Sequence, residues 1–202
     1  MHILFASQNL GKIAEVKKIF KDYRYRVLTL NDQELLEELG VKIPAGLIVA
    51  ETGKTLKANA LIKAQSFHQL SQLPCLADDS GLLLEAFSNF PGVDSKRWFK
   101  GTDQERNLAL LKKLEGQKNR RAKFQTVLCL FAFKQEKPLF FVGEVTGRIA
   151  TEPSGSAGFG YDPLFIPDGY KETFAQLGIE IKNKISHRAR AWQALVEYLN
   201  KN

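Results

Sequence analysis

The feature that most constrains the fold is a pair of strand-like runs in the second half of the chain. Residues 124–134 read Phe-Gln-Thr-Val-Leu-Cys-Leu-Phe-Ala-Phe-Lys and carry the strongest strand signal in the sequence, because β-branched and aromatic residues are frequent in them. Residues 139–145 form a similar run, and the short segment between the two predicts an antiparallel hairpin. Units of strand and helix precede this hairpin, so the sequence predicts a mixed sheet and an α/β fold.

The chain begins with a predicted strand, a polar turn and a helix. Residues 3–6 are apolar, and apolar residues return at helical spacing after the turn, at Ile13, Val16, Ile19 and Phe20. Ser7 and Asn9 can accept hydrogen bonds from helix N-terminal amides, and Lys12 adds a cation where the helix dipole favours an anion. A phosphate site and a plain N-cap both stay open as interpretations, and the turn lacks the full pattern of a P-loop.

Two adjacent carboxylates, Asp78 and Asp79, follow the apolar residues 74–77 and precede Ser80 and Gly81. We expect a strand that ends here and presents its acids at a rim. Neighbouring carboxylates repel one another, so a cation or a proton is expected between them, as in a hard-metal or general-base site. The alternative is an ordinary Asx turn that caps the strand.

A second polar group lies around the start of the helix predicted after residue 55. Glu51 lies just ahead of this helix, and Asn59 and Lys63 lie four residues apart on one of its faces. An acid, an amide and a cation can therefore converge on one ligand. The alternative is an exposed helix face with an acid at its N-terminal end.

The last third of the chain contains a glycine-rich loop and a helix start. Residues 147–165 include the segment Phe159-Gly160-Tyr161-Asp162-Pro163, which is too aromatic for a mere linker and predicts a ligand lid or a base-stacking loop. Ser186 is a natural N-cap, and His187 and Arg188 would then offer donors at the positive end of the following helix. The alternative for His187 is a plain surface position.

Composition and charge narrow the class of protein. A chain of 202 residues can bury one sizeable core, and the formal net charge of +7 favours a polyanionic partner, namely a nucleic acid, a nucleotide or a phosphometabolite. The sequence shows no signal peptide and no apolar membrane span, so we expect a cytoplasmic protein without a membrane partner. Cys75 and Cys129 lie in apolar runs, which predicts buried free thiols rather than a disulfide.

In their order along the chain, these motifs resemble the inosine triphosphate pyrophosphatase family (dITP/XTP diphosphatases). The resemblance covers nearly the whole chain, in residues 6–12, 51–53, 59–60, 63–64, 77–82, 91–92, 158–163, 173–175 and 185–189, together with Glu15, Ser95 and Arg97. The chain departs from the family pattern at residues 87–90 and at Gln8, where a glycine or another small or polar residue is expected.

The resemblance implies an ITPase-like fold, namely a single elongated, two-lobed α/β domain over residues 1–202. A mixed, strongly twisted β-sheet flanked by helices would form its centre, and the active-site cleft would lie between the lobes. The family implies a homodimer that cleaves non-standard purine nucleoside triphosphates (ITP, dITP and XTP) between the α and β phosphates. The products are the monophosphate and pyrophosphate, and Mg²⁺ is required.

The same resemblance assigns the site residues. Asp79 would be the general base and a metal ligand, Glu51 the second metal ligand, and Asp78 a neighbouring acid. The phosphates would be held by Ser7, Gln8, Asn9, Leu10, Gly11, Lys12, Lys63 and Ser80. The base would stack on Phe159 and contact Gly160, Tyr161, Asp162, Lys182, His187 and Arg188. Donors in this group would satisfy the 6-carbonyl of hypoxanthine or xanthine and oppose the 6-amino group of adenine.

Two other functions stay open. The net charge and the residues Arg120, Arg121 and Lys123 suggest a nucleic-acid-binding module, although the chain lacks an RRM, KH or zinc signature. Such a module would bind with an affinity that falls steeply with salt, and it would show no turnover. A pyrophosphatase for modified pyrimidine nucleotides would share Mg²⁺ and the acids, but not the purine contact of His187 and Arg188.

Overall fold

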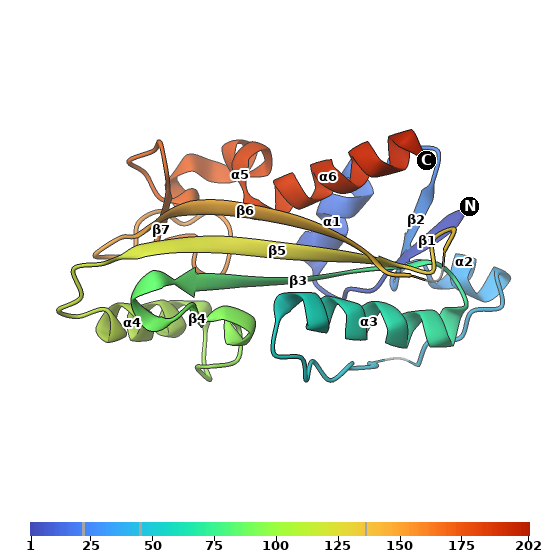
Figure 1. The fold of residues 1–202 in the computed structure, drawn as a ribbon, viewed down its shortest axis with the longest axis horizontal. Helices are drawn as coiled ribbons and strands as arrows, with labels where there is room; N and C mark the ends of the chain where they lie inside the picture. The colour runs from blue at the N-terminus through green and yellow to red at the C-terminus, as the bar shows by residue number, and fades with distance from the viewer. Residues whose placement is uncertain (22, 45, 136) are drawn as a thin grey trace. The chain divides into compact units, whose positions relative to one another are not determined.

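The computed structural model describes residues 1–21, 23–44, 46–135 and 137–202 (Figure 1). Its strands are β1 (His2–Phe5), β2 (Arg26–Thr29), β3 (Cys75–Leu84), β4 (Phe90–Pro91), β5 (Arg121–Phe131), β6 (Leu139–Ile149) and β7 (Phe165–Pro167). Its α-helices are α1 (Leu10–Ile19), α2 (Gln33–Glu38), α3 (Leu56–Ser71), α4 (Asp103–Lys113), α5 (Phe174–Ile185) and α6 (His187–Lys201).

The described strands form one mixed sheet. Its order is β2-β1-β3-β5-β6-β7, and β4 pairs with β3. β1 is parallel to β2 and to β3, whereas β4 is antiparallel to β3 and β7 is antiparallel to β6. Parallel neighbours need a crossover connection, and α1 provides one between β1 and β2. The prediction of an α/β fold with a mixed sheet is therefore confirmed.

Internal contacts divide the chain into two compact units. Unit 1 comprises residues 1–79 and 127–140, and unit 2 comprises residues 80–126 and 141–202. Each unit is thus built from two separate stretches of chain, and the boundaries fall within β3, β5 and β6. The cleft expected between two lobes stays a prediction.

In unit 1, the buried faces of the helices follow the spacing seen in the sequence. α1 buries Ile13 and Val16, and the buried residues of α3 include Ala60, Ala64 and Phe67. Each helix therefore turns an apolar stripe inward. In Figure 1, α1 and α3 lie on opposite sides of the strands of this unit. Successive residues of a strand point to opposite faces of a sheet, so neighbours in β3 can reach different helices.

In unit 2, a cluster of aliphatic and aromatic side chains forms the core. Its members include Leu82, Leu84, Leu110, Phe124, Phe165 and Phe174. The predicted start of α6 is confirmed, because Ser186 is its N-cap. Thr102 begins α4 with a capping box. The sequence does not predict α5, whose helical geometry is interrupted at Gly178, with φ of 76°.

The two adjacent acids do not end a strand. β3 carries Asp78 and Asp79 in its middle and continues to Leu84, so the expected strand end and the alternative Asx turn are both wrong. Asp, Ser and Gly favour turns in isolation, which explains the error. Tertiary contacts override that preference; for example, the Leu82 N–H donates to Ser95 Oγ at 2.8 Å.

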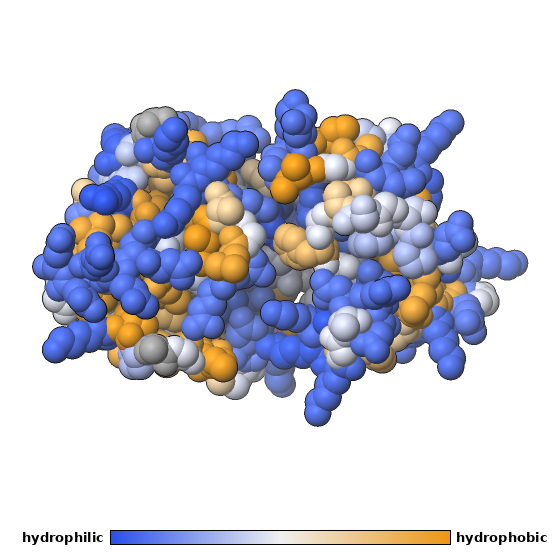
Figure 2. Space-filling view, turned by 180° about the vertical axis from the view of Figure 1, so that it is seen from behind, coloured by the Kyte–Doolittle hydropathy of each residue, from blue (hydrophilic) through white to orange (hydrophobic). Residues whose placement is uncertain are grey.

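No helix among the described residues has the length and apolar character needed to cross a membrane. Hydrophilic residues predominate on the face seen in Figure 2, and apolar residues are confined to separate patches. Exposed apolar side chains include Leu10, Ile48 and Phe159. Two of these, Leu10 and Phe159, belong to the residues predicted to contact a substrate.

The prediction of two buried free thiols is confirmed. Cys75 and Cys129 are 0% exposed, and burial raises the pKa of each thiol to about 12. Because thiolates rather than thiols react, we expect neither cysteine of the native protein to react with Ellman's reagent at pH 8. Both should react once the protein has been unfolded in urea. Rapid modification of one thiol in the native protein would contradict this expectation.

Candidate functional site

The turn before α1 combines a cap with a cation. Asn9 is the N-cap of α1, and its Oδ1 accepts from the Lys12 N–H at 3.1 Å. Ser7 Oγ accepts from the Asn9 N–H at 3.3 Å, and Gln8 Nε2 donates to the Leu47 carbonyl at 3.0 Å. Residues 8–11 are exposed. The cap interpretation is thus right for the local structure, and the turn stays accessible to an anion at the positive end of a helix.

The adjacent acids of β3 have different partners. Asp78 is 2% exposed and forms an ion pair with Lys12 at the start of α1, with Nζ and Oδ2 2.7 Å apart. Asp79 faces α3, where Asn59 Nδ2 donates to its Oδ2 at 3.1 Å. The two neighbours therefore bind different side chains, Asp78 on α1 and Asp79 on α3, as the alternation of strand side chains allows. The cation expected between them stays a prediction.

Lys63 lies between two carboxylates from separate segments. Its Nζ is 2.6 Å from Glu51 Oε1 and 3.7 Å from Asp79 Oδ1. The structure thus brings together the acid ahead of α3, the cation of α3 and the acid of β3. Asn59 completes this group, because its side chain is buried and its Oδ1 accepts from the Gly53 N–H at 2.8 Å. This bond ties the segment after Glu51 to α3.

Burial and charge shift the titration of this group. Burial opposes the charge on Lys63, but the carboxylates of Asp78, Asp79 and Glu51 outweigh it and raise the pKa of Lys63. The pKa of Asp79 is also raised, first by burial and then by the nearby carboxylates, although Lys63 and Asn59 oppose the shift. A raised pKa means that negative charge on Asp79 is incompletely compensated.

The same residues fit a hard cation. Glu51 and Asp79 supply carboxylate oxygens, which are the donors that Mg²⁺ prefers, and the ammonium of Lys63 already lies between them. In the parts of the chain that the structure describes, no cluster of three or more His, Cys, Asp or Glu side chains suited to a metal is found. Mg²⁺ usually takes one or two carboxylates from the protein, and waters and substrate phosphates are its other ligands. Glu51 and Asp79 match this number.

A second group of predicted residues lies in unit 2 around Phe159. This ring is 43% exposed, which leaves it available for stacking. Lys182 Nζ lies 4.4 Å and Arg188 Cζ 5.2 Å from the ring centroid, so two cations face it. Asp162 is buried and accepts from both the Phe159 N–H, at 2.9 Å, and the Lys182 ammonium.

The histidine and arginine at the start of α6 are both buried, at 4% exposure, so the plain-surface alternative for His187 is wrong. The His187 ring stacks on Phe124, with centroids 4.7 Å apart and planes inclined by 13°. A glycine in β6 lets the backbone of α6 lie close to this strand, because a Cβ atom on Gly143 would clash with the backbone of His187 and Ala191. The first turn of α6 is therefore held against β6.

Three other predicted site residues, Tyr161, Ser80 and Gly160, form hydrogen bonds within the protein. Tyr161 Oη donates to the Ser95 carbonyl at 2.5 Å and accepts from Trp98 Nε1 at 2.6 Å, and burial raises the pKa of Tyr161 to about 12. Ser80 Oγ lies 2.7 Å from Thr126 Oγ1 in a hydrogen bond. The N–H and the carbonyl of Gly160 are both hydrogen-bonded to side chains of α4.

The predicted residues thus form two groups. Those expected to hold phosphates and metal lie in unit 1, apart from Ser80, and those expected to contact the base lie in unit 2. Sequence reasoning missed Trp98, Asp103 and Asn107, whose contacts with the loop at residues 159–161 join segments more than fifty residues apart. No local motif signals such contacts.

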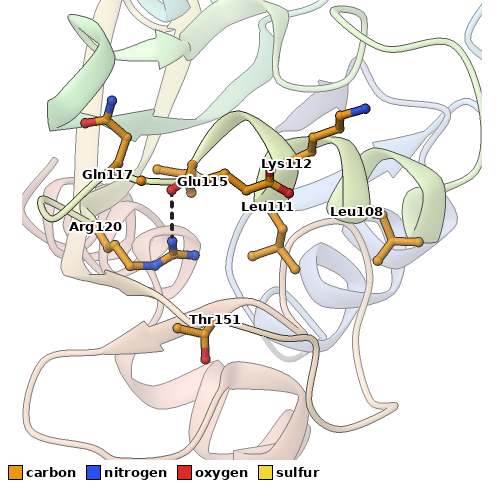
Figure 3. Close-up of a pocket in the computed structure, with 9 residues that line it drawn as sticks. Leu108, Leu111, Lys112, Glu115, Gln117, Arg120 and Thr151 are labelled. Atoms are coloured by element: carbon orange, nitrogen blue, oxygen red, sulfur yellow. Dashed lines mark hydrogen bonds between the residues drawn. The ribbon is translucent and has the colours of Figure 1, made fainter.

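A pocket of about 460 Å³ lies beside α4 and contains none of the predicted site residues (Figure 3). Arg120 lines it, and its guanidinium donates to the carbonyls of Leu114, Ile149 and Ala150. Arg121 pairs with Asp168 and Lys123 with Glu144. The three basic residues that suggested a nucleic-acid-binding module therefore all have partners within the protein.

Comparisons with known proteins agree with the resemblance. The model of the Ham1 family matches residues 3–198. A relative named dITP/XTP pyrophosphatase from Aquifex aeolicus is 42% identical, covering 98% of this chain and 96% of that protein. One of the same name from Deinococcus deserti is 41% identical, covering 96% of this chain and 86% of that protein. The solved structure of a HAM1 protein from Coxiella burnetii, 36% identical, covers 100% of both chains with a TM-score of 0.87. This chain therefore belongs to the Ham1 family.

Proposed function

We propose that this protein hydrolyses the non-standard purine nucleotides ITP, dITP and XTP to the monophosphate and pyrophosphate. The observation that carries the proposal is the arrangement of Glu51, Lys63 and Asp79, in which two carboxylates from separate segments meet at one cation. Phosphoryl transfer needs charge neutralisation and an oriented nucleophile. Lys63 would supply positive charge, and the two carboxylates would hold a metal ion and orient the attacking water. The names of the relatives, dITP/XTP pyrophosphatase, support the same class of hydrolase.

Asp79 would act as the general base. The side chain of Asp79 is 10% exposed, so little bulk water competes for it, and Asn59 fixes its orientation through the 3.1 Å hydrogen bond. A base whose pKa is raised toward the working pH holds a proton more readily during the reaction. In this proposal Asp79 accepts the proton of the attacking water.

Glu51 and Asp79 would hold Mg²⁺, which supplies charge neutralisation for the phosphate oxygens when it is bound. Lys63 and Lys12 are the cations placed to contact the triphosphate. Each is paired with a carboxylate in this structure, so binding of a phosphate would add an anionic partner to an ammonium that is already oriented. The exposed turn at residues 8–11 would receive a phosphate at the N-terminus of α1.

Recognition of the base would come from unit 2. Phe159 would stack on the purine, and Lys182, His187 and Arg188 would supply donors for the 6-carbonyl of hypoxanthine or xanthine. Adenine would bring an amino group to the same donors. Buried donors that lose their acceptor cost roughly 1 to 3 kcal/mol each, so two such contacts would discriminate by a factor on the order of 10² to 10⁴.

A substrate panel tests the proposal. Pyrophosphate release is measured for ITP, dITP, XTP, ATP and GTP with Mg²⁺ and again after chelation with EDTA. We expect the first three to be cleaved at least about 10² times more efficiently than ATP, in kcat/KM, and activity to be lost without the metal. Comparable cleavage of ATP would contradict base selection. A wild-type protein that cleaves none of the five would contradict the proposed function, and salt-sensitive binding of an RNA probe would then favour the nucleic-acid alternative.

We also propose, from the resemblance, that the protein is a cytoplasmic homodimer whose partner is the nucleotide substrate. Its basic residues support a polyanionic ligand of this kind. The ion pairs of Arg121 and Lys123 leave less free positive charge for a nucleic acid on β5. A nucleic-acid partner is therefore not expected.

A further inference from the structure

The loop that carries Phe159 is bound from one side by the first turns of α4. Asp103 Oδ2 accepts from the Gly160 N–H at 2.7 Å. One helical turn further, Asn107 Nδ2 donates to the Gly160 carbonyl at 2.9 Å. Both polar groups of a single backbone residue are thus bound by two side chains of one helix. We call this arrangement, formed by Asp103, Asn107 and Gly160, the α4 clamp.

The bond to Gly160 is the main polar interaction of the Asn107 side chain. The residue is 3% exposed, and among the described residues its Oδ1 has no hydrogen-bond partner. A buried amide is unfavourable unless it is hydrogen-bonded, and an apolar residue would suit a core position of α4 better. The bond to Gly160 is therefore the interaction that accounts for an asparagine at this position.

Asp103 is oriented for the same contact. Arg106, one turn later in α4, donates to Asp103 Oδ1 at 2.6 Å, which directs the other oxygen to the Gly160 N–H. Burial opposes the charge on Asp103, but the hydrogen bonds from Gly160 and Arg106 outweigh it and lower the pKa of Asp103. The clamp therefore holds an ionised carboxylate against the loop at neutral pH.

The α4 clamp binds the backbone next to the exposed ring of Phe159. Phe159 precedes Gly160, and its own N–H is bound by Asp162, so the backbone on both sides of the ring is fixed. Gly160 has a φ of 62°, a conformation that other residues rarely adopt, and its N–H and carbonyl directions follow from it. Without the clamp, the cations Lys182 and Arg188 would still face the ring, but the loop backbone would be free to shift.

We propose that Asp103 and Asn107 are positioning residues that set the place of Phe159 for stacking on the base. This inference rests on the proposed function, because it assumes that Phe159 meets a purine. Neither residue would touch the phosphates or the reacting atoms. Changes in the clamp should therefore weaken binding of the base and leave binding of pyrophosphate unchanged.

Two variants and a matched control test the clamp. Asn107→Ala removes the donor to the Gly160 carbonyl. Asp103→Asn removes the charge at a side chain that is 50% exposed, so this second variant should fold even if the first does not. Gln104→Ala changes an exposed residue of the same helix turn and serves as the control.

The first measurement is product inhibition of dITP hydrolysis. We expect the inhibition constant of IMP and the KM of dITP to rise roughly three- to tenfold in each clamp variant, as expected for loss of one hydrogen bond. The inhibition constant of pyrophosphate, kcat and the control variant should change by less than about twofold by the same reasoning. An unchanged IMP constant in both clamp variants would overturn the proposal, as would an equal rise for IMP and pyrophosphate.

The second measurement does not depend on turnover. Hydrogen exchange of a peptide covering residues 156–163 should be faster in both clamp variants than in the wild type or the control. Asp103→Asn leaves one oxygen for two donors, Arg106 and the Gly160 N–H, and Asn107→Ala removes the donor to the Gly160 carbonyl. Unchanged exchange would contradict the clamp itself. If the wild-type protein neither cleaves dITP nor binds IMP, the proposed function fails while the exchange comparison still decides whether α4 restrains the loop.

Discussion

Replacing Asp79 by asparagine is expected to lower the rate of pyrophosphate release from dITP by a factor of about 10² to 10⁴, the usual contribution of a general base. Asparagine keeps the size of the side chain and can still accept from Asn59, but it cannot take a proton from water. The fold should survive, because Lys63 keeps Glu51 as a partner at 2.6 Å. The variant should therefore show an unfolding free energy close to that of the wild type.

The matched control is Asp168→Asn, which removes an exposed carboxylate that pairs with Arg121. Exposed ion pairs contribute about 0 to 1 kcal/mol, so this variant should keep its activity and nearly all of its stability. Initial rates are measured for both variants at saturating dITP and Mg²⁺, together with their urea unfolding curves. Wild-type rates for Asp79→Asn would exclude Asp79 as the base.

The second large effect is expected on stability, at the buried pair of Lys182 and Asp162. The two side chains are 7% and 3% exposed, and Lys182→Met would leave the carboxylate of Asp162 buried without its cation. Breaking one side of such a pair typically costs about 3 to 5 kcal/mol. We expect a loss of that size in the free energy of unfolding, measured by urea denaturation.

A double variant separates the charge from the packing. Asp162→Asn combined with Lys182→Met removes both charges, so most of the lost stability should return. Lys184→Met, at an exposed position of the same helix, is the control and should be nearly neutral. If Lys182→Met alone proved as stable as the wild type, the buried ion pair would not stabilise the fold. Even the stable double variant should have a higher KM for dITP, since Phe159 loses the cation that lies 4.4 Å from its ring.

Local signals in the sequence predicted the parts of the fold that local physics controls. The spacing of Ile13 and Val16 predicted the buried face of α1, and Ser186 predicted the start of α6 because its hydroxyl binds an N-terminal amide. The pairing of Glu51 with Lys63 was also foreseeable, since both lie near one helix face. These features depend on residues close in sequence or on strong periodicity.

Features set by distant contacts were not predictable in the same way. β3 continues through Asp78 and Asp79, where local preferences favour a turn, because Lys12 from α1 and Asn59 from α3 compensate the acids in the folded chain. The Asp-Asp-Ser-Gly motif likewise could not show that Asp78 binds a side chain of α1 and Asp79 a side chain of α3. The α4 clamp is a further case, since Asn107 and Gly160 are 53 residues apart and neither belongs to a recognisable pattern.

The division of the chain into two discontinuous units has a consequence for synthesis. Unit 1 requires residues 127–140 in addition to its first 79 residues, so a chain emerging from the ribosome cannot complete this unit until about two thirds of it has been made. Neither unit can be expressed as an uninterrupted fragment. Truncation at residue 79 would leave β1 and β2 without the part of β5 that belongs to their unit, and the nascent chain should expose apolar surface to chaperones until that segment arrives.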